Sequence, residues 1–158
     1  MRGINPTQLT ARVATVALAT LLGACAAAQA EGPTWDPNKP VALPSGNIAY
    51  QNINEAIQMA DVWGDRAIGA HGTFGKFPAN FEAPLHTHTF AYSGVVVAGV
   101  MTNPFGKEGE KNPPQMPAGS YWYVPAGVPH TTACISDTPC QFFFDSAGAF
   151  DFVPVAAK

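Results

Sequence analysis

The chain has 158 residues, which is enough for one domain and short for two. Hydrophobic residues make up 47% of it and charged residues only 12%, so the chain can bury a substantial core. Its net charge is −3 without a basic cluster, which argues against nucleic acid as a partner. Fifteen glycines and fifteen prolines favour short strands joined by tight turns over long helices.

The first thirty residues are typical of a targeting segment rather than of a folded domain. Two arginines precede an alanine-rich apolar run, and Ala28-Gln29-Ala30 has the small-x-small pattern of a signal peptidase site. This pattern predicts export to the periplasm or secretion, with a mature chain that begins at Glu31. In a second interpretation, Leu22-Gly23-Ala24-Cys25 resembles a bacterial lipobox, and a lipid on Cys25 would tether the domain to a membrane.

The rest of the chain is predicted to be all-β and to form one domain. Residues 31–55 should form an N-terminal arm and an edge strand, and residues 56–155 the β-domain itself. Strands within this domain are expected at residues 57–63, 68–77, 81–90, 94–101, 121–124, 130–136, 141–145 and 150–155. Residues 102–117 read as a surface loop, and the apolar run 94–101 as a strand covered on both faces. Many short strands and almost no helix favour a β-sandwich or barrel.

Cys134 and Cys140 lie close together beyond the leader, with Ile135-Ser136-Asp137-Thr138-Pro139 between them. In an oxidising compartment such a pair is expected to form a disulfide across a hairpin turn. Two free buried thiols are the alternative.

Three histidines indicate a metal site. His86 and His88 are two residues apart, so their side chains point the same way from an extended strand. His130 follows the turn-forming run 125–129, which can return it toward the other two. Imidazole suits zinc, copper, iron and nickel. The alternative is three interior histidines that hold no metal.

These spacings resemble the two motifs of the cupin superfamily, the RmlC-like jelly rolls. The first motif reads here Asn80, five residues, His86-Thr87-His88, three residues, Tyr92, six residues, Gly99, with Asn80 and Tyr92 where the family has Gly and Glu. The second reads Gly119, five residues, Pro125-Ala126-Gly127, two residues, His130, three residues, Cys134, and departs from the family only at Cys134, where the family has Asn. The chain looks most like small exported bacterial cupins with a single domain.

The resemblance implies a jelly-roll β-barrel with the metal inside it. His86, His88 and His130 would correspond to the histidine ligands of a divalent transition metal such as iron, zinc, nickel or manganese. Many cupins form dimers through edge strands, so the resemblance also implies a homodimer.

The missing Glu leaves three candidates for its role. Tyr92 stands at the aligned position, where it would contact the metal or a ligand, or simply pack in the core. Glu82 lies four residues before His86, so strand parity aims it inward, unless it is a solvated carboxylate near a bulge. A water or substrate in an open coordination position needs no residue at all. His71 also enters the barrel by parity, as a general base or as an ordinary core histidine.

Two functions remain open at this level. The first is a metal-dependent enzyme that acts on a small molecule, either oxygenase-like with iron or hydrolytic or isomerising with zinc, with Tyr92 and Glu82 as candidate catalytic residues. The second is a non-catalytic periplasmic module that binds or senses a small molecule or a metal. A cavity lined by aromatic residues would favour a partly hydrophobic ligand. The aromatic residues expected in the core or the barrel lining are Trp63, Phe74, Phe77, Tyr121, Trp122, Tyr123, Phe142, Phe143 and Phe144.

Overall fold

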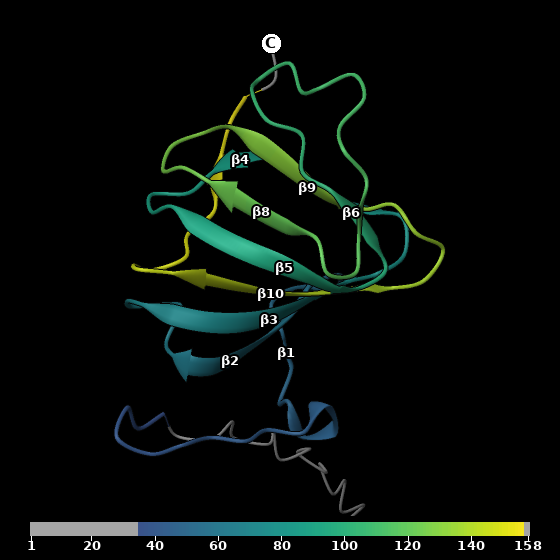
Figure 1. The fold of residues 1–158 in the computed structure, drawn as a ribbon. Coiled ribbons are helices and arrows are strands. Elements are labelled where there is room, and N and C mark those ends of the chain that lie inside the picture. Colours follow the sequence, from purple (N-terminus) through teal and green to yellow (C-terminus); the bar gives the residue numbers. More distant parts are fainter. Residues whose placement is uncertain (1–34, 157–158) are drawn as a thin grey trace, which may run out of the picture.

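The computed structural model describes residues 35–156, and its strands form two antiparallel sheets that face each other across one core (Figure 1). The first sheet has the order β1-β2-β3-β10-β5-β8, with β1 Gln51–Asn52, β2 Gln58–Gly64, β3 His71–Phe77, β10 Cys140–Ser146, β5 Tyr92–Ala98 and β8 Tyr121–Val124. The second has the order β11-β4-β9-β6-β7, with β11 Val153–Pro154, β4 Phe81–Thr87, β9 His130–Cys134, β6 Val100–Thr102 and β7 Met116–Pro117. This confirms the all-β jelly roll. The leader, including Cys25, lies outside the described residues.

Helix is almost absent from the part of the chain that the structure describes. A single 3₁₀ turn, η1 (Ser45–Asn47), lies in the arm before β1. Residues 35–156 contain no helix that is long and apolar enough to cross a membrane.

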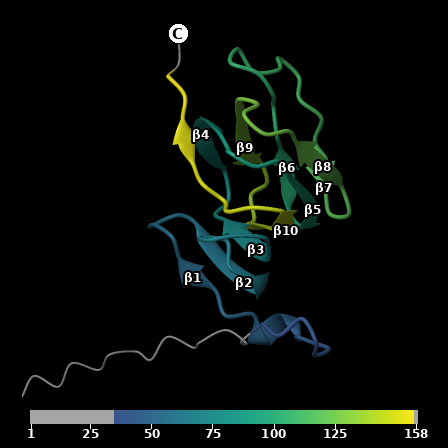
Figure 2. The ribbon, with the colours of Figure 1, turned by 90° about the vertical axis from the view of Figure 1, so that its left-hand side faces the viewer.

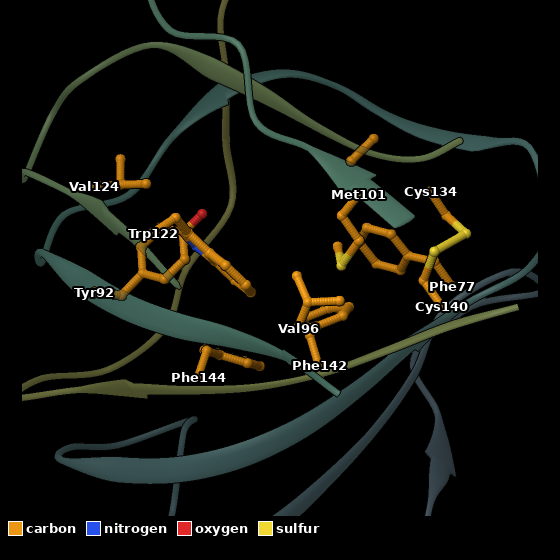
Figure 3. Close-up of a cluster of buried hydrophobic side chains, with 11 residues drawn as sticks. Phe77, Tyr92, Val96, Met101, Trp122, Val124, Cys134, Cys140, Phe142 and Phe144 are labelled. Atoms are coloured by element: carbon orange, nitrogen blue, oxygen red, sulfur yellow. A yellow bond between two sulfur atoms is a disulfide. The ribbon is translucent and has the colours of Figure 1, made fainter. Parts of the chain in front are cut away.

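The core follows from the alternation of side chains along the strands. In β10, Phe142 and Phe144 are buried, while Phe143 points to the other face and packs edge-on against Phe74, with ring centroids 5.2 Å apart. In β8, Trp122 is buried between two exposed tyrosines, so the prediction that those tyrosines line the barrel is wrong. Figure 3 shows the central cluster, which consists of Phe77, Ala83, Tyr92, Val96, Met101, Trp122, Val124, Cys134, Cys140, Phe142 and Phe144.

The predicted strand 94–101 is in fact two strands in different sheets. The chain leaves β5 at Gly99, which has φ +79°, and continues as β6 in the second sheet. A Cβ at Gly99 would lie 2.7 Å from the Cys140 Sγ, so only glycine fits this corner. Val95 and Val97 are exposed on the outer face of β5, and the expectation of a strand covered on both faces is therefore wrong.

The disulfide between Cys134 and Cys140 is present, but it does not lie across a hairpin. Cys134 ends β9, which pairs with β4 and β6, and Cys140 begins β10, which pairs with β3 and β5. Both edges of β10 are already occupied, so the connection must cross from one sheet to the other. The disulfide therefore fastens the two sheets together at one end of the fold, and the first residue of β9, His130, lies at the opposite end of that strand.

Other boundaries move by a few residues. The strand expected from residue 68 begins at His71, because the Ile68 and Gly69 amides both donate to the Asp65 carbonyl in a turn. The expected loop 102–117 is not all surface: its first residues belong to β6 or are buried, and residues 116–117 form β7. The final strand is reduced to β11, which lies beside β4 (Figure 2).

Candidate metal centre

The three histidines meet at the end of the barrel away from the disulfide. His86 lies near the end of β4, His88 follows that strand, and His130 begins β9 directly opposite His86 in the strand register. Their candidate ligand atoms all lie within 4.8 Å of one another, and all three side chains are buried. The structure thus brings together the three residues that the spacing predicted.

The proline-rich turn between β8 and β9 holds this arrangement. Gly127 has φ +71°, and its amide donates to the His88 carbonyl over 2.9 Å. Because His88 lies beyond the last residue of β4, this hydrogen bond fixes a backbone position that no strand pairing supports. The turn therefore positions His88 as well as returning the chain to His130.

Each histidine has its Nδ1 paired with a backbone carbonyl. His86 Nδ1 donates to Pro84 over 2.6 Å, His130 Nδ1 donates to Val128 over 2.9 Å, and His88 Nδ1 donates to the Asp151 carbonyl. A hydrogen on Nδ1 leaves the Nε2 lone pair free in all three rings. Outer hydrogen bonds of this kind fix the ring orientation of metal-binding histidines.

The free Nε2 atoms make the cluster a candidate cation site. The Nε2 atoms of His86 and His88 are only 3.1 Å apart, so two lone pairs face each other unless a proton or a metal lies between them. Burial lowers the pKa of each of these two rings to about 4, despite their hydrogen bonds to backbone carbonyls, and it also lowers the pKa of His130. At neutral pH the rings are therefore neutral. Three neutral imidazoles with convergent lone pairs are a donor set that fits a divalent transition metal.

A segment near the C-terminus, which was predicted only to form a strand, covers two of the rings. Phe150 stacks on His88 with ring centroids 4.2 Å apart, and Phe152 stacks on His86 at 4.3 Å. Between them, Asp151 presents its carbonyl to His88 and its carboxylate to the backbone amide of Thr89, over 2.8 Å. The alternation of the Phe-Asp-Phe sequence thus aims two rings and one carbonyl at the site.

Tyr92 lies inside the barrel, at the position expected from the aligned motif. Its hydroxyl is 3.0 Å from His130 Nε2, and because that nitrogen is an acceptor the phenol donates to it. Burial raises the pKa of Tyr92 to about 12, so the phenol stays protonated at neutral pH. A metal that binds His130 must therefore replace this hydrogen bond.

Glu82 does not point inward, so the parity argument for it was wrong. A bulge between Ala83 and His86 shifts the alternation of β4, with the result that Ala83 is buried and Glu82 is exposed. The other candidate, His71, does enter the barrel and is fully buried, as its strand parity predicted. Its Nδ1 bonds the Thr73 hydroxyl over 2.8 Å, and that hydroxyl donates to Asp61 over 2.6 Å. His71 therefore belongs to a separate hydrogen-bonded chain and not to the three-histidine cluster.

Two adjoining hollows lead to the cluster. The inner cavity is about 60 Å³ and is lined by His86, His88 and Tyr92 together with apolar side chains. The outer cleft is about 670 Å³ and lies between the β1–β2 connection, β4 and the segment 150–152. The residues common to both are Ile57, Met59, Ala83, Phe150 and Phe152. A small molecule in the outer cleft would therefore lie next to the metal-binding atoms across an apolar boundary.

The domain has the jelly-roll fold of cupins, with three histidines clustered inside it. The match to solved structures supports the fold. An RmlC-like cupin from Shewanella frigidimarina superposes with a TM-score of 0.55 at 16% identity, over 66% of this chain and 87% of that one. The polyketide cyclase RemF from Streptomyces resistomycificus superposes with a TM-score of 0.62 at 14% identity, over 76% and 88%. KdgF from a Halomonas species superposes with a TM-score of 0.56 at 15% identity, over 69% and 94%.

The chain belongs to a family described as a domain of unknown function, DUF4437, whose model matches residues 39–157. No curated protein matches the sequence. The likeness to the solved structures therefore supports the architecture, and the function must be argued from the site.

Proposed function

We propose that this domain is an exported metalloprotein in which His86, His88 and His130 bind one divalent transition metal and present it to a small, partly apolar molecule. The observation that carries this proposal is the pairing of all three Nδ1 atoms with carbonyls, which leaves three convergent Nε2 lone pairs in a buried site. An unrelated set of core histidines has no reason to share one tautomer and one point of convergence.

The metal, when bound, supplies a Lewis acid or a redox centre with open coordination positions for a ligand. The chain supplies the rest. The three rings hold their lone pairs in place, Phe150 and Phe152 cover two of them from outside, and the apolar outer cleft binds the body of the molecule. Small-molecule chemistry at an interior metal is consistent with the small, mostly apolar inner cavity.

The lining favours an enzyme of the oxygenase-like kind over one that needs a protein base. Among the described residues, no carboxylate lines the inner cavity, and the phenol of Tyr92 has a pKa of about 12 because it is buried. A general base works best with a pKa near the working pH, so Tyr92 suits hydrogen-bond donation better than proton abstraction. The lack of a protein base is also compatible with a second function, in which the domain is a non-catalytic module that binds a small molecule or a metal.

Two observations support export. The first thirty residues have the pattern of a signal peptide, and the disulfide between Cys134 and Cys140 is a feature of proteins in oxidising compartments. Mass spectrometry of the mature N-terminus distinguishes a soluble chain that starts at Glu31 from a chain that carries lipid on Cys25.

The test of the proposal is the metal content of the mature protein, purified from the periplasm without a His-tag. The comparison is a variant with alanine at positions 86, 88 and 130, and the matched control is His71→Ala, which removes the one histidine outside the cluster. We expect one metal per chain in the protein and in the control, and none in the triple variant.

The identity of the metal then directs the search for a substrate. Iron would point to oxygen chemistry, and zinc or nickel would point to hydrolytic, isomerising or sensing roles. No metal in any of the three proteins, even after reconstitution with each metal, would contradict the proposal.

A further inference from the structure

Two hydrogen-bond donors beside the histidine cluster have no acceptor. Trp122 Nε1 and Asn103 Nδ2 are buried atoms without a hydrogen-bond partner, on side chains that are each only 5% exposed. Buried donors without acceptors are rare, because water has been removed from them and nothing replaces it. The Tyr92 hydroxyl oxygen lies close to both side chains, but neither donor meets hydrogen-bond geometry with it, so an acceptor from outside the chain could satisfy both.

Both donors flank Tyr92. The side chains of Thr132, Asn103 and Trp122 lie close enough to its hydroxyl to lower the pKa of Tyr92, against the larger rise that burial causes. Figure 3 shows the indole nitrogen of Trp122 near the hydroxyl oxygen of Tyr92, in the upper left of the cluster. Trp122, Thr132 and Tyr92 also line the inner cavity with His86 and His88.

The amide of Asn103 is held in one orientation. The Thr132 hydroxyl donates to Asn103 Oδ1 over 2.8 Å, and this bond turns the oxygen toward Thr132 while it leaves the amide nitrogen without a partner. The unpartnered end of the Asn103 amide is therefore its donor. Trp122 can only donate, because the indole N–H has no lone pair to share.

Metal binding would add a third donor. The Tyr92 hydroxyl now donates to His130 Nε2, the atom that a metal would take. Once that lone pair is used, the phenol O–H needs a new acceptor in the same part of the cavity. One hydroxyl and two N–H groups would then lack an acceptor in the neighbourhood of the metal.

Charge completes the description of the ligand. Three neutral imidazoles leave the full positive charge of a divalent metal in place, and among residues 35–156 no carboxylate lines the inner cavity, since Glu55 and Asp151 line the outer cleft instead. An anionic oxygen ligand would supply both the missing negative charge and the missing acceptors. A neutral or cationic head group would supply one of them at most.

Size and surroundings define the other end of the ligand. The inner cavity of about 60 Å³ is room for roughly two water molecules, and so for a head group of a few atoms. The adjoining cleft of about 670 Å³ is lined largely by apolar side chains, among them Ile53, Ile57, Met59, Phe81 and Phe150. The ligand therefore combines a small anionic head with an apolar body.

We propose that the centre binds a monocarboxylate with an apolar body, with the carboxylate between the metal and the donors Trp122 Nε1, Asn103 Nδ2 and Tyr92 Oη. This proposal deepens the proposed function and rests on it, since the carboxylate needs the metal as a ligand site. It assigns to Trp122 and Asn103 the role of selecting an anion.

The test uses the full mature protein loaded with Co²⁺, whose absorption spectrum reports changes at the metal. Hexanoate, 1-hexanol and acetate are titrated into it by calorimetry and by spectroscopy. We expect hexanoate to bind at least about tenfold more tightly than either of the others and to shift the cobalt spectrum. The alcohol has the tail without the charge, and acetate has the charge without the tail.

Variants locate the effect. Trp122→Phe removes the N–H and keeps an aromatic ring, and we expect it to bind hexanoate about tenfold or more weakly while 1-hexanol changes little. Asn103→Leu provides the same comparison should Trp122→Phe fail to fold. The matched control is Tyr121→Phe, an exposed neighbour in β8, which should bind hexanoate as the unchanged protein does.

The outcomes separate the two proposals. Equal affinity for hexanoate and 1-hexanol in cobalt-loaded protein would contradict the inference that the centre binds a carboxylate, but it would not contradict the proposed metal centre. Acetate that binds as tightly as hexanoate would overturn the role of the cleft. Unchanged hexanoate affinity in Trp122→Phe and Asn103→Leu would overturn the assigned donors. A protein that takes up no cobalt would overturn both this inference and the proposed function.

Discussion

Replacing Tyr92 with phenylalanine should tighten metal binding. In the structure the phenol donates to His130 Nε2 over 3.0 Å, and both groups are buried. A metal at the cluster takes that same lone pair, so the hydrogen bond exists only in the metal-free state. Removing the hydroxyl therefore destabilises the metal-free protein and leaves the metal–imidazole bond unaffected.

The magnitude follows from the cost of an unpaired buried acceptor. An unsatisfied Nε2 on the fully buried His130 costs about 1–3 kcal/mol of folding free energy in the metal-free Tyr92→Phe protein. That cost disappears when metal binds, so the affinity for metal should rise by the same free energy, roughly 5- to 150-fold. The melting temperature of the metal-free variant should fall by roughly 4 °C for each kcal/mol.

The assay is a titration with Zn²⁺ in competition with a chelator, together with thermal melts of the metal-free forms. Tyr123→Phe is the control, because its hydroxyl lies on an exposed side chain of the same strand pair and should change neither quantity. Metal affinity that falls tenfold or more in Tyr92→Phe would refute the reasoning. It would indicate that the phenol is a ligand to the metal or supports one.

Three further predictions concern stability, pH and the exposed carboxylate. Reduction of the Cys134–Cys140 disulfide should lower the free energy of unfolding by about 2 kcal/mol, because the closed loop is short; equal melting temperatures with and without reductant would contradict this. Burial lowers the pKa of His86 and His88 from 6.5 to about 4, so the unfolded chain binds more protons than the folded, metal-free chain as the pH falls. The contribution of these rings to stability is therefore intact above about pH 6.5 and lost progressively down to about pH 4, which denaturant midpoints measured across that range will show. Glu82→Gln should alter neither metal affinity nor the melting temperature, because Glu82 is exposed outside the barrel. Weaker metal binding in this variant would indicate that Glu82 contributes to the metal centre after all.

The parts of the fold and site that the sequence could predict are those set by local spacing. The two-residue spacing of His86 and His88, and the proline-glycine turn before His130, are short-range signals, and the structure places all three residues together. The inward position of His71 follows from the regular alternation of β3. The disulfide could also be predicted, because Cys134 and Cys140 are close in sequence and the third cysteine lies in the leader.

The parts that could not be predicted depend on contacts between distant segments. The bulge that turns Glu82 outward is a property of the pairing between β4 and β9, which a single strand does not reveal. Gly99 divides one apolar run between two sheets, and a separate change of sheet, from β9 to β10, takes the disulfide out of the expected hairpin.

The most informative residues were missed for the same reason. Phe150 and Phe152 reach the histidines from the far end of the chain, and Asn103 lies within a stretch whose composition indicates a loop. The unpartnered amide nitrogen of Asn103 could not be predicted from the sequence, because it depends on the contact between the Asn103 oxygen and Thr132. Sequence patterns locate the ligands, whereas tertiary packing defines what surrounds them.

The three-histidine metal centre can be tested directly by a crystal structure of the metal-loaded mature protein, with anomalous diffraction recorded at the absorption edge of the bound metal. We predict one anomalous peak about 2.0–2.2 Å from the Nε2 atoms of His86, His88 and His130, with every Nδ1 still paired to its carbonyl and the Tyr92 hydroxyl turned away from His130. A peak elsewhere, coordination through Nδ1, or a bond from the Tyr92 oxygen to the metal would contradict it.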